Sequence, residues 1–312
     1  MPGAERMTLI EGTPFQMGST GFYIEEAPIR KVRVRSFWID RSPVTNRQFA
    51  QFVSETGYRT KAEIPPDPAD YPGMDPALAQ PGSLVFRRPD APAGAQDWNQ
   101  WWEFCDGADW RHPLGPGSSL DGLEDHPTVH VSYEDAAAYA KWAKKRLPTE
   151  AEWELAASGG ASDGRAYAWG DELAPAGRMM ANYWQGLFPH ENTLDDGWER
   201  TSPVGAFPAN KFGLFDMIGN VWEWTSDWYA MPKAESRKRP GSCCATDNPR
   251  GAKWRESLDP ATPDIRIGRK VLKGGSHLCA ENYCQRYRPA ARYPQTIDTS
   301  TSHIGFRCAR DA

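Results

Sequence analysis

The high content of glycine and proline is the feature that most limits how this chain can fold. Its 312 residues include 28 glycines and 27 prolines, spread along the whole sequence. Proline fixes φ and removes a backbone donor, and glycine weakens the helices and strands that contain it. We therefore expect short regular elements joined by much irregular chain.

Three segments nevertheless show helical periodicity, and each begins with the same pattern. Thr45, Ser132 and Thr149 each stand three residues before an acid or an amide, and apolar residues follow. This pattern is a capping box, in which two side chains satisfy backbone donors at a helix start. We therefore predict three helices, with apolar faces at 49–53, 136–142 and 153–157.

The rest of the chain offers fewer signals of regular structure. Alternating apolar residues from Val32 to Ile39 predict a strand on which the helices pack. Two proline-containing stretches, 62–96 and 231–269, are interpreted as long irregular loops, which usually serve function or are mobile. Cys243 and Cys244 fall in the second stretch and are expected to be plain loop residues, with a vicinal disulfide or an accessory metal site as the alternatives.

The composition limits the kind of protein this can be. No polar linker or change of composition divides the chain, so we predict a single domain over residues 1–312. A net charge of −5 gives no basic footprint for nucleic acid. No apolar run approaches the roughly 20 residues of a membrane helix. Because Met1 to Met7 lacks the features of a secretory signal, we expect a cytoplasmic protein.

Two cysteines near the C-terminus, Cys279 and Cys284, lie in a basic segment. Between Lys273 and Arg292 the chain has four cations and one acid, Glu281. Cationic neighbours lower the pKa of a thiol, and the thiolate is the metal ligand and nucleophile. The spacing is too wide for a C-x-x-C site, and no second pair completes a zinc site. Two thiolates suit Cu(I), whereas buried apolar thiols or a disulfide are the alternatives.

The residues around these cysteines form a long motif. The chain reads Gly-Gly-Ser-His-Leu-Cys-Ala-Glu-Asn-Tyr-Cys-Gln-Arg-Tyr-Arg-Pro-Ala-Ala-Arg from Gly274 to Arg292, and Gly-Phe-Arg-Cys from Gly305. Three motifs precede it: Arg-Leu-Pro-Thr-Glu-Ala-Glu-Trp-Glu at 146–154, Ala-Asn-Tyr-Trp-Gln-Gly at 181–186 and Gly-Asn-Val-Trp-Glu-Trp at 219–224. Together they resemble the formylglycine-generating enzymes, also called sulfatase-modifying factors. The similarity runs from about residue 7 to residue 310.

The resemblance implies a fold and an activity. The fold is α+β, compact and poor in regular structure, and belongs to the C-type-lectin-like superfamily. The activity is oxidation of a cysteine to Cα-formylglycine, within Cys-x-Pro-x-Arg of an unfolded type I sulfatase or another protein. Molecular oxygen is the oxidant, and a thiol reductant supplies the remaining electrons. Cys279 and Cys284 would bind Cu(I), and further site roles fall to Ser276, Trp222, Tyr283 and Arg292. The alternatives are core packing for Trp222 and Tyr283 and a structural ion pair for Arg292.

The resemblance also implies two calcium sites that would fix irregular chain. Calcium binds carboxylate and carbonyl oxygens. The ligands of the first site would be the Asn182 side chain, the Tyr183 carbonyl, the Asp196 side chain and the Trp198 carbonyl. The ligands of the second site would be Asp216, Gly219, Val221 and Glu223.

The chain departs from the commoner family pattern at several positions. Ala280 stands where many members have histidine, and the run from Gln295 differs from the frequent Asn-Thr-Pro-Asp-Ser-Ser. Pro289 replaces a cysteine that forms a disulfide in secreted relatives, so Cys308 is expected to be buried without a partner. We interpret the chain as a bacterial subgroup that retains the activity.

Two other functions remain possible within the wider superfamily. A lectin-like binding module would need neither cysteine of the pair. An iron-dependent sulfoxide synthase would need a His-rich facial triad. The six histidines of this chain show no helical H-x-x-x-H spacing, and none belongs to the usual iron motif of the superfamily, so the copper-dependent oxidase is favoured.

Overall fold

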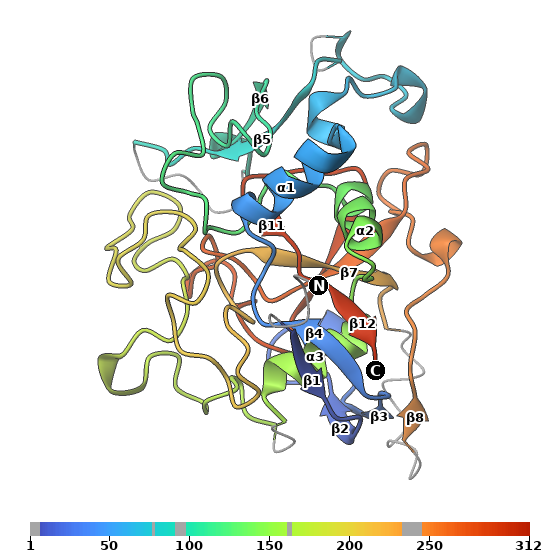
Figure 1. Cartoon of the computed structure of the whole chain (residues 1–312), viewed down its shortest axis with the longest axis vertical. Coiled ribbons are helices and arrows are strands. Elements are labelled where there is room, and N and C mark those ends of the chain that lie inside the picture. Colours follow the sequence, from blue (N-terminus) through green and yellow to red (C-terminus); the bar gives the residue numbers. More distant parts are fainter. Residues whose placement is uncertain (1–6, 77–78, 91–97, 161–163, 233–244) are drawn as a thin grey trace.

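Short elements joined by long irregular segments make up the computed structural model, which describes residues 7–76, 79–90, 98–160, 164–232 and 245–312 (Figure 1). Cys243 and Cys244 lie outside the described residues. The described α-helices are α1 (Asn46–Thr56), α2 (Tyr133–Trp142) and α3 (Glu150–Ser158). The short 3-10 helices are η2 (Ile24–Glu26), η3 (Lys61–Glu63), η4 (Pro68–Asp70), η6 (Trp98–Gln100), η7 (Pro175–Gly177) and η8 (Trp254–Glu256).

All three predicted helices are confirmed, together with their capping boxes. The N-cap residues are Thr45, Ser132 and Thr149, and in each box the N-cap side chain and the third helical side chain both accept hydrogen bonds from backbone N–H groups. The longest helix, α1, has 11 residues. Within the described ranges no helix has the length and apolar character needed to cross a membrane.

The strands form four small sheets. The sheet that carries the site has the order β10-β9-β7-β11, with β10 at Arg292–Thr296, β9 at Arg269–Lys273, β7 at Trp222–Trp228 and β11 at Ile304–Gly305. A second has the order β1-β4-β12 (Met7–Ile10, Phe37–Asp40, Ala309–Asp311). The others are β2-β3-β8 (Pro14–Met17, Arg30–Arg33, Thr246–Asp247) and β5-β6 (Gly82–Phe86, Trp102–Asp106). Figure 1 shows β5 and β6 at one end of the molecule and β2, β3 and β8 at the other.

The predicted strand from Val32 to Ile39 is wrong, because this segment is two strands in different sheets. The buried residues are Val32 and Val34, then Phe37 and Ile39, so the alternation slips by one residue between the pairs. Between the two strands, the backbone forms a hydrogen bond with a side chain and not with a neighbouring strand. The N–H of Arg35 donates to Asn248 Oδ1 at 2.9 Å. The stretch 62–96 is also less irregular than predicted, because it contains β5.

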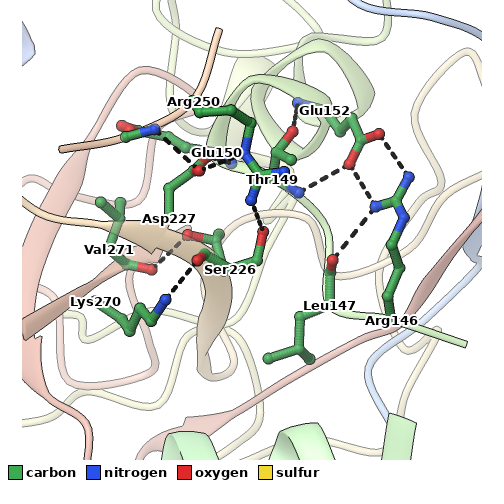
Figure 2. Close-up of polar contacts among 12 residues, drawn as sticks. Arg146, Leu147, Thr149, Glu150, Glu152, Ser226, Asp227, Arg250, Lys270 and Val271 are labelled. Atoms are coloured by element: carbon green, nitrogen blue, oxygen red, sulfur yellow. Dashed lines mark hydrogen bonds and ion pairs between the residues drawn. The ribbon is translucent and has the colours of Figure 1, made fainter. Parts of the chain in front are cut away.

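The Leu-Pro-Thr-Glu-Ala-Glu motif joins the start of α3 to β7, in the sheet that carries the site (Figure 2). The carboxylate of Glu152 forms two hydrogen bonds of 2.8 Å with Arg146. The N–H of Glu150 donates to Asp227 Oδ2 on β7 at 2.8 Å, and Arg250 donates to the other oxygen of Asp227 at 2.9 Å. These contacts fix α3 beside the strand that leads to the site.

Candidate functional site

The motif that contains the two cysteines is the loop between β9 and β10. The carbonyl of Ala280 accepts hydrogen bonds from the N–H groups of Tyr283 at 3.1 Å and Cys284 at 2.8 Å. This turn brings the sulfurs of Cys279 and Cys284 to 3.2 Å, and both residues are free thiols. A disulfide bond is about 2.05 Å long. The five-residue spacing therefore produces a close pair of thiols that are not bonded to each other.

Two distant motifs hold this loop in place. The carbonyl of Asn220 accepts from the N–H of His277 at 3.0 Å, and the carbonyl of Cys279 accepts from the N–H of Trp184 at 3.0 Å. The same Asn220 donates its own N–H to the carbonyl of Asn182 at 2.8 Å. The motifs at 181–186 and 219–224 therefore converge on the cysteines.

The cations of this segment are neutralised by carboxylates from elsewhere in the chain. The pairs are Lys273 with Glu154, Arg286 with Glu25, Arg288 with Glu26 and Arg292 with Glu150. Of the four cations, Arg286 also contacts a sulfur, since its Nη1 lies 3.9 Å from Cys284 Sγ. All four cations of the predicted basic segment are thus paired with carboxylates, and Arg286 is the one among them that also lies beside a thiol.

The two thiols are unequal. A hydrogen bond from Cys279 and the charge of Arg286 lower the pKa of Cys284 to about 7, although burial opposes this shift. Burial raises the pKa of Cys279 well above its ordinary value. Cys284 is therefore the more acidic thiol of the pair, and Cys279 lies where it can donate a hydrogen bond to the sulfur of Cys284.

A cavity of about 400 Å³ opens over the cysteines, and Ser276, Trp222 and Tyr283 are among its lining residues. Ser276 is fully buried, and its Oγ accepts a hydrogen bond from the N–H of Leu278 at 3.2 Å. Tyr283 is 40% exposed, and its ring stacks on Phe188 with the centroids 4.4 Å apart. The cavity is therefore an aromatic pocket with sulfur and hydroxyl groups among its lining residues.

Arg292 does not reach this cavity. Its guanidinium bonds both carboxylate oxygens of Glu150, at 2.7 and 3.0 Å, and the carbonyl of Ala230 at 3.1 Å. It lines a separate cavity of about 520 Å³. In this structure Arg292 acts as a buried ion-pair partner that joins β10 to α3.

Several lining residues could not be found from the sequence. They are chiefly aromatic or imidazole side chains from distant segments: Trp98, Trp101, Trp102, Phe188, Tyr293 and His303. The Nδ1 of His303 lies 2.6 Å from Thr301 Oγ1, and burial lowers the pKa of this imidazole well below its usual value. The cluster of three tryptophans at 98–102 was the available signal, but it has no helical or strand periodicity.

The residues of the first predicted calcium site fit a hard cation. Asn182 Oδ1 and Asp196 Oδ2 are both buried, and neither has a hydrogen-bond partner. The side chain of Gln185 joins the two segments, because its amide donates to the carbonyl of Tyr183 and its oxygen accepts from the N–H of Asp196 at 3.3 Å. Burial raises the pKa of Asp196 to about 6. A bound cation would satisfy both oxygens and favour the charged carboxylate.

The residues of the second predicted calcium site fit a cation less well. Both oxygens of Glu223 accept from Arg307, the shortest distances being 2.7 Å, and Trp153 donates to the same carboxylate at 2.8 Å. Asp216 Oδ2 accepts from the N–H of Gly205 at 2.7 Å. Because the guanidinium of Arg307 already supplies a positive charge to Glu223, the second calcium site stays a prediction.

Histidine, cysteine and acidic side chains do not gather in metal-binding groups of three or more anywhere in the described ranges. The pair of sulfurs and the amide and carbonyl oxygens considered above are ligand sets of a different kind. Cys308 is fully buried and free, as expected.

Comparison with known proteins places the chain in a family. The family model described as sulfatase-modifying factor enzyme 1-like domain matches residues 2–312. The chain belongs to this family. The formylglycine-generating enzyme of Mycobacterium tuberculosis is 54% identical over 97% of this chain and 96% of its own length. That of Mus musculus is 43% identical over 98% of this chain and 75% of its own length.

The family also contains a member named as inactive. The inactive Cα-formylglycine-generating enzyme 2 of Bos taurus is 36% identical over 98% of this chain and 88% of its own length. Among solved structures, PvdO from Pseudomonas aeruginosa has a TM-score of 0.60 at 21% identity and covers 98% of this chain and 94% of its own. That likeness concerns the fold alone. The predicted family of formylglycine-generating enzymes and the predicted fold class are thus confirmed.

Proposed function

We propose that this protein oxidises a cysteine of a sulfatase to Cα-formylglycine. The observation that carries the proposal is the pair of sulfurs 3.2 Å apart, Cys279 and Cys284, beneath an aromatic cavity. The names of relatives 45% to 54% identical to the chain support the same activity. A lectin-like binding module would need a cavity but no pair of thiols.

The overall reaction balances with oxygen and a thiol reductant. The client cysteine exchanges its CH2SH group for an aldehyde, and its sulfur leaves as hydrogen sulfide. One O2 is consumed, it takes two electrons from the client's Cβ, and one water forms together with the aldehyde. The oxidation of thiol reductant to disulfide supplies the remaining two electrons and two protons.

The donor set of the site suits Cu(I). Soft thiolates select this ion, and Cys279 and Cys284 provide two of them. Bound Cu(I) would supply the one-electron chemistry that activates oxygen. The chain's own groups have separate tasks: Arg286 stabilises the negative charge on Cys284, and the hydroxyl of Ser276 is available to donate a hydrogen bond to an oxygen species.

The client must reach the cysteines as an extended chain. The cavity, about 400 Å³ in volume, admits a few side chains and no folded domain. Trp222 and Tyr283 contribute aromatic faces that exclude water from the reacting sulfur. We therefore propose an unfolded segment with Cys-x-Pro-x-Arg as the substrate.

We also propose that the first predicted calcium site, Asn182, Tyr183, Asp196 and Trp198, is occupied in solution. The unpaired oxygens of Asn182 and Asp196 support it. The ion would neutralise a buried carboxylate and fix the segment that bonds Cys279 through Trp184.

Mass spectrometry of a short Cys-x-Pro-x-Arg peptide tests the enzymatic proposal. With Cu(I), oxygen and dithiothreitol, wild-type protein should convert the peptide thiol to an aldehyde, and Cys279→Ser should not. Cys105→Ser is the matched control, because Cys105 is a free cysteine outside the cavity. If the peptide mass never changes across several sequences, the enzyme proposal fails and a binding module takes its place.

A further inference from the structure

A short N-terminal segment, Tyr23–Glu26, lies against the active-site loop and has no place in the chemistry above. We call it the N-terminal brace. The hydroxyl of Tyr23 accepts a hydrogen bond from the N–H of Gln285 at 3.0 Å. The Tyr23 ring centroid lies 3.8 Å from the guanidinium carbon of Arg286. The brace therefore contacts the two residues that directly follow Cys284.

The brace also forms an ion pair with Arg286. Glu25 Oε1 accepts from Arg286 Nη2 at 2.6 Å, and the two side chains are 11% and 17% exposed. The other terminal nitrogen, Nη1, points to Cys284 Sγ at 3.9 Å. Arg286 Nε is buried without a partner. One planar guanidinium therefore joins the carboxylate of Glu25 to the sulfur of Cys284.

We propose that Glu25 is a positioning residue for the thiolate pair. By binding Nη2 of Arg286, it holds Nη1 of the same group beside Cys284 and so strengthens the binding of Cu(I) by this sulfur. The proposal rests on the copper site proposed above. Groups that orient a metal ligand from outside the ligand set commonly change metal affinity by about 10- to 100-fold.

Removal of the Glu25 charge should have two opposite effects on the affinity for Cu(I). The direction of the net change therefore distinguishes a positioning role of Glu25 from a simple charge effect. A complex of Cu(I) with two thiolates is anionic, so the loss of a nearby carboxylate alone would make it more favourable. The loss of the anchor frees a long arginine side chain to turn toward solvent, which removes the positive charge closest to Cys284. Charge interactions weaken with distance, and the guanidinium lies between Glu25 and the sulfur, so we expect the second effect to dominate.

The chain offers a matched control in the next residue. Glu26 forms a more deeply buried pair with Arg288, whose side chain is 1% exposed. Arg288 Nε donates to the carbonyl of Gln285 at 2.8 Å, so this pair holds the same loop without contacting a sulfur. Glu26→Gln should therefore destabilise the fold at least as much as Glu25→Gln and leave the copper affinity unchanged.

Competition with a chromophoric Cu(I) chelator under anaerobic conditions measures the predicted effect. Glu25→Gln should bind Cu(I) about tenfold or more weakly, and Glu26→Gln should match the wild type. Glu25→Asp, which keeps the charge, should recover part of the loss. The double variant Glu25→Gln with Arg286→Gln should bind no more weakly than Arg286→Gln alone. An affinity of Glu25→Gln that is equal to or higher than that of the wild type overturns the proposal.

A second readout needs no copper. Iodoacetamide reacts with the thiolate form of a cysteine, which Arg286 stabilises at Cys284. In reduced, metal-free protein, peptide mapping should show slower modification of Cys284 in Glu25→Gln than in wild type or Glu26→Gln. A wild type that binds no Cu(I) would refute the copper site, whereas an unchanged or faster modification in Glu25→Gln would refute the role of Glu25.

Discussion

At the scale of single residues, a change at Ser276 should affect the rate of the reaction without affecting the binding of copper. Its hydroxyl lines the cavity, and its Oγ already accepts one backbone hydrogen bond. Ser276→Ala should lower the rate of peptide conversion by about 10²- to 10³-fold, because loss of one donor at a reacting centre commonly has that cost. Copper affinity should be unchanged. A variant that has lost its copper, or one that reacts at the wild-type rate, would contradict this role.

The residues of the site could be predicted where the motif places them side by side. Cys279, Cys284 and Ser276 lie within nine residues of one loop. Arg292 belongs to the same motif, but its partner Glu150 is 142 positions away in the sequence. The sequence shows a run of cations, and their neutralisation depends on carboxylates that are brought to the loop by the fold.

At the scale of secondary-structure elements, the helices were predictable because their signals are local. A capping box needs only four consecutive residues, and all three boxes form. The strands were harder, since the phase slip between Val34 and Phe37 becomes visible only once the burial is known. The cavity walls combine residues of five strands, β5, β6, β7, β9 and β10, with residues of η6 and of irregular segments, so no single sequence period marks them.

The start of α2 contains a carboxyl group whose titration should be measurable. Asp135 is almost fully buried, and burial raises its pKa to about 6 even though Ser132, Tyr58 and Lys61 donate hydrogen bonds to it. An acid whose pKa is higher in the folded state than in the unfolded state stabilises the fold at low pH. That contribution disappears as the pH rises from about 4 to about 6.

The resulting prediction concerns the wild type compared with Asp135→Asn. The difference in unfolding free energy, wild type minus variant, should fall by up to about 3 kcal/mol between pH 4 and pH 6. Urea denaturation at several pH values measures it. Glu134→Gln, an exposed change in the same helical turn, should give a nearly constant difference. A difference that rises with pH for Asp135→Asn would show that its hydrogen bonds outweigh its burial.

At the scale of the whole molecule, distant segments share one hydrophobic core from Ile10 to Ala309 and are also joined by buried polar contacts. Asn220 bonds both the loop at 182 and the active-site loop, and Glu223 is enclosed by Arg307 and Trp153. Motifs separated by tens of residues therefore meet at one place. Their family order could be recognised in the sequence, but their convergence on the cysteines could be seen only in the fold.

Calcium should stabilise the molecule through the segment at 182–198. A ligand that binds only the folded state adds RT ln(1 + [L]/Kd), or about 2.7 kcal/mol at a hundredfold excess over Kd. Chelation with EGTA should therefore lower the melting temperature of wild type by a few degrees and scarcely change that of Asp196→Ala. Asp195→Ala is the control, because Asp195 is exposed and bonds Thr193. Equal shifts in wild type and Asp196→Ala would exclude the site.

The central claim is that Cys279 and Cys284 act together as thiolate ligands, and the stoichiometry of Cu(I) binding tests it most directly. Reduced wild-type protein, titrated with Cu(I) in the presence of a competing chelator, should bind one ion per chain. Cys308→Ser, which changes a buried cysteine far from the pair in the sequence, should also bind one. Cys279→Ser and Cys284→Ser should each bind none. Wild-type stoichiometry in either of these two variants would contradict the claim.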